Sequence, residues 1–122
     1  MIIDCNIHHI PEDLFTNDEL LNGFLTSIPR GYGDIAYLGE TESGARQIIV
    51  EKPKGYTNLN NVEGDYSLEM KLKAMDDNGV DIGILRVAPV WQQWLRLDIC
   101  KKINDSAAEM CKRSNGRLFA KQ

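Results

Sequence analysis

The sequence has few of the residues that build metal clusters or disulfide frameworks. Its 122 residues include two histidines and three cysteines, which are Cys5, Cys100 and Cys111. The cysteines are widely spaced and form no Cys-x-x-Cys pair, which excludes the patterns of zinc ribbons and small disulfide-stabilised domains. Free cysteines are commonly buried as small apolar residues. We therefore expect a structural role for all three, with Cys5 in the core.

The sequence also lacks an excess of positive charge and a long apolar run. Fourteen basic residues stand against 18 acidic ones, so the net charge is −4. This balance provides no basic stripe for binding phosphates, and nucleic acid is not an expected partner. No basic segment precedes an apolar run at the N-terminus, and no apolar stretch reaches the roughly 18 residues of a membrane span. We expect a cytoplasmic chain that does not bind a membrane.

Both histidines lie in the first eleven residues, next to a short apolar run. Hydrophobic residues make up 43% of the chain and charged residues 26%, as in ordered globular proteins. The apolar run followed by polar groups predicts a buried strand that delivers functional side chains at its C-terminal end. Side chains alternate along a strand. This alternation predicts one face with Asp4, Asn6 and His8, and another with Cys5, Ile7 and His9.

Beyond this strand, the sequence predicts an alternation of strands and helices. We expect a helix over 17–25 with a brake at Asn22-Gly23, then a hairpin of strands 35–38 and 47–51 around a six-residue loop. A helix capped by Ser67 and closed by Gly79 follows, and then a strand over 81–88. Next come a long helix, whose apolar face runs from Leu95 to Met110 and which Asn115-Gly116 ends, and a strand from 118. Residues 53–64 have loop composition and form either a lid over the site or a solvated connection.

Three blocks of the sequence, in chain order, carry a family resemblance. They are Ile3-Asp4-Cys5-Asn6-Ile7-His8-His9-Ile10-Pro11, then Met75-Asp76-Asp77-Asn78-Gly79-Val80-Asp81, then Ile103 to Ala120 with Asn115-Gly116-Arg117. Together they resemble the opening of the amidohydrolase superfamily, in the branch of aminocarboxymuconate-semialdehyde decarboxylase and related aromatic-acid decarboxylases. That branch carries a His-x-His motif on its first strand, shortly before a proline. Here Asn6 stands at the first histidine and His8 at the second.

The resemblance implies an α/β fold, the N-terminal portion of a (β/α)8 TIM-like barrel. Residues 1–122 would be a single partial domain with about three parallel strands and two crossover helices, and residues 16–66 an excursion after the first strand. A complete barrel needs about 250 residues. We therefore expect a truncated or divided chain, whose missing half carries the remaining metal ligands and the catalytic aspartate.

The resemblance also implies one divalent metal ion, zinc or manganese, in the complete enzyme. His8 and Asn6 are the ligands that this chain would supply, although a carboxamide binds such ions weakly. The alternative for His8 is an ordinary hydrogen-bonded core histidine. We expect His9, on the other face, to be structural. No catalytic residue is assigned in this chain.

Two further residues are candidates for binding a carboxylic-acid substrate. Arg86, inside the second parallel strand, either binds a substrate carboxylate or forms an ion pair with Asp4, and the ion pair is the favoured interpretation. Trp91 either forms a wall of the substrate pocket or is buried against the next helix.

The implied activity is that of a metal-dependent hydrolase or decarboxylase acting on a small carboxylic acid. The alternative is a catalytically silent chain that acts as an oligomerising or interaction module. A partial parallel sheet leaves an unpaired edge and an uncovered apolar face. For this reason we expect either a homo-oligomer or association with a missing C-terminal half.

Overall fold

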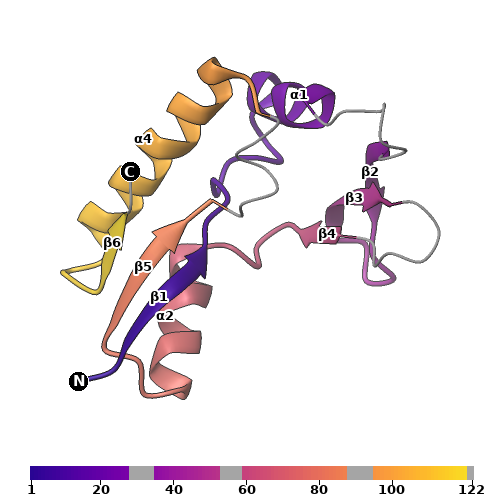
Figure 1. Ribbon diagram of the computed structural model, residues 1–122. Coiled ribbons are helices and arrows are strands. Elements are labelled where there is room, and N and C mark those ends of the chain that lie inside the picture. The colour runs from indigo at the N-terminus through magenta and orange to yellow at the C-terminus, as the bar shows by residue number, and fades with distance from the viewer. Residues whose placement is uncertain (28–34, 53–58, 88–94, 121–122) are drawn as a thin grey trace.

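Two three-stranded sheets and three helices make up the computed structural model, which describes residues 1–27, 35–52, 59–87 and 95–120. The sheets are parallel, in the order β1-β5-β6, and antiparallel, in the order β2-β3-β4 (Figure 1). In chain order the elements are β1 (Ile3–His8), α1 (Asp18–Ser27), β2 (Ile35–Glu40), β3 (Arg46–Glu51), β4 (Leu59–Val62), α2 (Leu68–Asp77), β5 (Ile82–Arg86), α4 (Leu97–Arg113) and β6 (Leu118–Ala120). The expected α/β class with three parallel strands is confirmed.

One face of the parallel sheet is covered by α2 and α4. A single core cluster joins residues of both helices to the sheet: Met75 of α2, Ala107 and Met110 of α4, Leu85 of β5 and Leu118 of β6. Gly83 of β5 lies on this face, because a Cβ built there would meet the side chains of Ile7, Leu118 and Met75. Since successive side chains alternate along a strand, the residues between these point to the opposite face.

A second core cluster lies between α1, the antiparallel sheet and the first half of α4. It contains Leu14 and Phe15 from the turn after β1, Leu20, Leu21 and Phe24 of α1, Ile48 and Val50 of β3, and Ile99 and Ile103 of α4. The apolar face of α4 thus contributes its first half to this core and its second half to the core on the parallel sheet. This helix therefore packs against both sheets.

The first helix continues past the residue expected to stop it. Asn17 caps its start by accepting a hydrogen bond from the Leu20 backbone N–H at 3.1 Å. The predicted brake at Asn22-Gly23 is wrong, because α1 runs on to Ser27. A Cβ at Gly23 would lie 2.2 Å from the Cδ1 atom of Ile99. The glycine therefore permits close packing of α1 against α4 instead of ending the helix.

The antiparallel sheet contains the predicted hairpin and one additional strand. Strands β2 and β3 pair from Ile35 opposite Glu51 to Glu40 opposite Arg46, so each strand is longer and the loop shorter than expected. The expectation of loop structure throughout 53–64 is wrong for β4, which pairs with β3. Asparagine has low strand propensity, but tertiary context overrides this. The buried Asn61 accepts a hydrogen bond from the Tyr66 hydroxyl at 3.0 Å.

The other helix ends follow their local signals. Ser67 accepts a hydrogen bond from the Met70 backbone N–H at 3.2 Å, as an N-cap does. After α2, Gly79 has a φ of 69°, and after α4, Asn115 and Gly116 have φ angles of 53° and 79°. These left-handed conformations terminate both helices where the sequence predicted.

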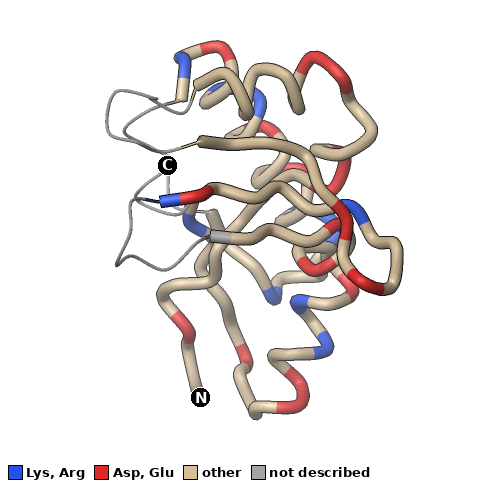
Figure 2. Tube along the Cα trace, turned by 90° about the vertical axis from the view of Figure 1, so that its right-hand side faces the viewer, with Lys and Arg blue, Asp and Glu red and all other residues tan. Residues whose placement is uncertain are grey.

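Charged residues of both signs are interspersed along the trace in Figure 2. Several pairs join distant segments: Arg113 with Glu12, Lys102 with Glu19, and Arg117 with Asp76. Within the described ranges, we find no helix with the length and apolar character that crossing a membrane requires.

Candidate functional site

An irregularity in β1 determines which side chains face which way. Ile3 and Asp4 pair with Ile82 and Gly83, whereas Ile7 and His8 pair with Leu85 and Arg86, so the register shifts by one residue between Asp4 and Ile7. The Asp4 carboxylate accepts a hydrogen bond from the Asn6 backbone N–H at 2.9 Å. Aspartate commonly makes this contact with the residue two positions on, and here it stabilises the bulged backbone.

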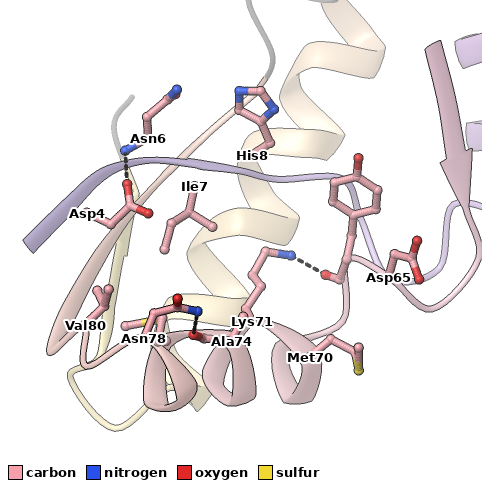
Figure 3. A pocket seen from close by; sticks show the side chains of 12 residues that line it. Asp4, Asn6, Ile7, His8, Asp65, Met70, Lys71, Ala74, Asn78 and Val80 are labelled. Carbon is pink, nitrogen blue, oxygen red and sulfur yellow. Dashed lines mark hydrogen bonds between the residues drawn. The ribbon is translucent and has the colours of Figure 1, made fainter. Parts of the chain in front are cut away.

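The bulge separates Asp4 from the two candidate metal ligands. Figure 3 shows Asn6 and His8 on the side of β1 away from α2, with Ile7 pointing toward α2. Asp4 pairs with Gly83, which faces the helices, and lies on the α2 side. The prediction that Asn6 and His8 share a face is confirmed, but the placement of Asp4 with them is wrong. Simple alternation fails because the bulge inserts one extra residue.

Arg86 lies beside His8 on the helix-free face. The two residues are the last of their strands and are direct register partners. The favoured ion pair between Arg86 and Asp4 is wrong, because Asp4 pairs with Gly83 and faces the helices. In the part of the chain that the structure describes, no carboxylate forms an ion pair with Arg86. The other candidate, Trp91, lies outside the described residues.

His9 points into the helix-covered side and is 2% exposed. Its Nε2 lies 2.8 Å from the Ser106 hydroxyl, which itself donates to the Ile103 carbonyl. The hydroxyl hydrogen is therefore used, and His9 Nε2–H donates to Ser106. The buried Nδ1 has no hydrogen-bond partner among the described residues. Burial lowers the pKa of His9 to about 4, and the nearby positive charge of Lys71 acts in the same direction. The imidazole is thus neutral at pH 7.

The described residues do not by themselves fit a metal ion. Within the described ranges, no three His, Cys, Asp or Glu side chains are grouped as a metal site requires. Asn6 and His8 offer one carboxamide and one imidazole, whereas structural zinc takes four ligands and catalytic zinc takes three protein ligands. Cys5 is exposed, so its expected place in the core is wrong; the other two cysteines are partly buried.

Sequence reasoning missed a cavity between β1 and α2, drawn in Figure 3. Its volume is about 460 Å³. Its lining brings together the predicted site residues Asp4, Asn6 and His8, the further polar residues Asp65, Tyr66, Lys71 and Asn78, and the apolar residues Ile7, Met70, Ala74, Met75 and Val80. Lys71 is 7% exposed, and its ammonium donates to the Tyr66 carbonyl. A signal for this was present, because Leu68, Lys71, Leu72 and Met75 fall at the i, i+3, i+4 and i+7 spacing of one helix face.

Similarity to known proteins does not assign this chain to a family. No family model and no curated protein matches this chain.

Proposed function

We propose that this chain forms the first strands of a metal-dependent amidohydrolase-like enzyme, a hydrolase or decarboxylase that acts on a small carboxylic acid. One observation carries the proposal. Asn6, His8 and Arg86 lie together at the C-terminal ends of adjacent parallel strands, on the face that the helices leave uncovered. Barrel enzymes place their chemistry at this end of their strands.

The arrangement of the sheet supports the barrel part of the proposal. In a (β/α)8 barrel, strands follow each other in chain order, every crossover helix lies outside, and the opposite face forms the interior. Here β1, β5 and β6 are neighbours in chain order, and both crossover helices pack on one face. The helix-free face then corresponds to the barrel interior, and it carries Ile84 and Phe119, which are register partners on β5 and β6.

Each polar residue has a role in this proposal. The His8 imidazole binds the divalent ion, zinc or manganese, and Asn6 contributes a weak oxygen ligand. These two residues alone do not complete a metal site, which takes at least three protein ligands. The Arg86 guanidinium, which is next to His8 and has no carboxylate partner among the described residues, binds the substrate carboxylate. Asp4 stabilises the backbone that presents Asn6 and His8.

Metal binding by the 122-residue chain tests the assignment of His8 and Asn6 as ligands. Manganese(II) broadens the NMR signals of amides close to it, so weak binding is detectable residue by residue. We expect the amides of residues 6–8 and 86 to broaden first, and His8→Ala to abolish the effect. Asn6→His would place two imidazoles on one face, and we expect it to tighten binding by about tenfold or more.

Asn60→His is the matched control, because it adds a histidine to the exposed Asn60 of β4, in the other sheet. It leaves broadening at residues 6–8 unchanged if the proposal holds. Equal broadening in wild type and His8→Ala, or no gain from Asn6→His, contradicts the metal assignment.

Benzoate, a small aromatic carboxylate, tests the role of Arg86 separately. We expect benzoate to shift the Arg86 side-chain NMR signal and the neighbouring His8 ring signals. Arg86→Met removes the guanidinium while keeping a long side chain, and the His8 shift should then disappear. An unchanged His8 shift in this variant contradicts the assignment of Arg86.

An oligomerising module is the second candidate function, and the exposed apolar side chains favour it. Ile3 and Phe119 are 50% and 52% exposed, and both alternate with residues that face the helices. Exposed apolar surface next to unpaired strand edges promotes association. Sedimentation distinguishes the cases: a concentration-dependent dimer that Phe119→Lys dissociates supports this candidate, and a stable monomer at all concentrations contradicts it.

A further inference from the structure

We propose that the cavity between β1 and α2 is a binding site for a small aldehyde or ketone, which condenses with the Lys71 amine to form an imine. The cavity lies between β1 and α2, and the residues that line it include Asn6 and His8 as well as Lys71 (Figure 3). The inference concerns the Lys71 amine alone, so it does not depend on whether Asn6 and His8 bind a metal ion.

The cavity has the size that a small carbonyl compound requires, and it has both apolar and polar walls. Its volume of about 460 Å³ lies within the usual range for small-molecule sites, about 300–1,000 Å³. Ile7 of β1, Met75 of α2 and Val80 supply apolar walls, and Lys71 supplies a buried amine. The other polar residues of the lining are Asp4, Asn6, His8, Asp65, Tyr66 and Asn78. Apolar walls together with convergent polar groups are typical of ligand sites.

Contacts with Tyr66 fix the position of the Lys71 amine, but no carboxylate of the described residues pairs with its positive charge. Its position is set by donation to the Tyr66 carbonyl and by the Tyr66 ring, whose centre lies 5.6 Å from Nζ. No carboxylate of the described residues forms an ion pair with it. Glu12, whose negative charge acts on Lys71, is instead bound by Arg113 and by the Leu68 backbone N–H. An ammonium buried without a carboxylate partner is costly, and it loses its proton readily.

Electrostatics support the neutral amine that imine formation needs. Burial lowers the pKa of Lys71 to about 8, and the negative charge of Glu12 opposes the shift only in part. An ordinary lysine has a pKa of about 10.4, so at pH 8 the neutral fraction of Lys71 exceeds it about 100-fold. Desolvation of this kind is a known way to activate a lysine as a nucleophile.

The reaction is balanced without a further co-reactant. The lone pair of neutral Nζ attacks the carbonyl carbon, and the C=O π electrons move to oxygen. A proton passes from nitrogen to that oxygen and gives a carbinolamine. Loss of the second N–H proton with the hydroxyl group releases water and leaves the C=N bond.

Reductive trapping with butanal and cyanoborohydride tests the proposal in the intact chain. Hydride reduction converts the imine to a stable secondary amine, and peptide mass spectrometry locates it. Lys73 is the internal control, because it lies on the same helix but is largely exposed and paired with Asp77. A less basic amine is also a weaker nucleophile, so near pH 8 we expect labelling of Lys71 to exceed that of Lys73 by about tenfold, not 100-fold.

Two substitutions and unfolding in urea provide the controls for this experiment. Lys71→Met removes the fast-labelled site, whereas Lys73→Met retains it, and unfolding in urea should equalise the two lysines. If Lys71→Met does not fold, the ratio of Lys71 to Lys73 labelling in wild type still decides. Equal or slower labelling of Lys71 in the folded chain overturns the proposal, and it leaves the metal assignment of His8 untouched.

Discussion

The two faces of the parallel sheet differ in what covers them and in what they carry. The face toward α2 and α4 contains Gly83, Leu85 and Leu118, which are packed in a shared core. The opposite face carries exposed Phe119 together with His8 and Arg86 at the strand ends. Burial on one face therefore supplies stability, and the other face remains available for binding. The bulge in β1 decides which residues belong to which face.

The largest expected effect comes from truncating the covered face. Leu85 is 1% exposed and Phe119 is 52% exposed, on adjacent strands of one sheet. Leu85→Ala removes buried methyl groups and leaves a cavity, so we expect a loss of about 2–5 kcal/mol in the free energy of unfolding. Phe119→Ala should change it by less than about 1 kcal/mol. Urea denaturation measures both.

Similar losses of unfolding free energy in Leu85→Ala and Phe119→Ala would contradict the proposed difference between the two faces. In that case the helix-free face is covered in solution, and sedimentation of wild type and Phe119→Ala would show whether a second copy covers it.

A pH dependence of stability is expected from the covered face, because His9 is buried there in its neutral form. Its folded pKa of about 4 lies below the ordinary value of 6.5. The unfolded chain therefore binds the proton more readily between these values. The stabilising contribution is complete above pH 6.5 and is lost as the pH falls toward 4, with a total on the order of 3 kcal/mol.

Urea denaturation between about pH 7 and pH 4 measures this effect, and His9→Gln provides the comparison. Glutamine does not titrate, so the slope of stability against pH over this range should become shallower in the variant. An unchanged slope would show that other groups, and not His9, cause the loss.

The smallest expected effect concerns the bulge that sorts residues between the faces. Asp4→Ala removes the carboxylate that accepts from the Asn6 backbone N–H. We expect a loss of about 1 kcal/mol in stability and faster hydrogen exchange at the Asn6 amide. Asp105→Ala, at an exposed position in α4, is the control and should leave this amide unchanged. Unaltered exchange in Asp4→Ala would show that the sheet alone maintains the bulge.

Features that depend on neighbouring residues were largely predictable. The cap at Ser67, the turn at Gly79 and the end of α4 at Asn115-Gly116 occur as expected, and so does the β2–β3 hairpin, although its strands are longer than predicted. Within the candidate site, the shared face of Asn6 and His8 was also predicted. Each rests on contacts between residues a few positions apart, or on the fixed period of a strand or helix.

Features that depend on distant segments were not predictable in the same way. Gly23 continues its helix because Ile99 packs against it, and β4 forms because β3 offers a partner. The burial of Lys71 becomes visible once α2 packs under β1, and the separation of Asp4 from Arg86 follows from the register between β1 and β5. The sequence by itself determined the order of strands and helices apart from β4, the helix ends at Ser67, Gly79 and Asn115-Gly116, and the shared face of Asn6 and His8. Tertiary structure alone decided which face each polar residue joined, because pairing between distant strands can shift the register by one residue and reverse the alternation.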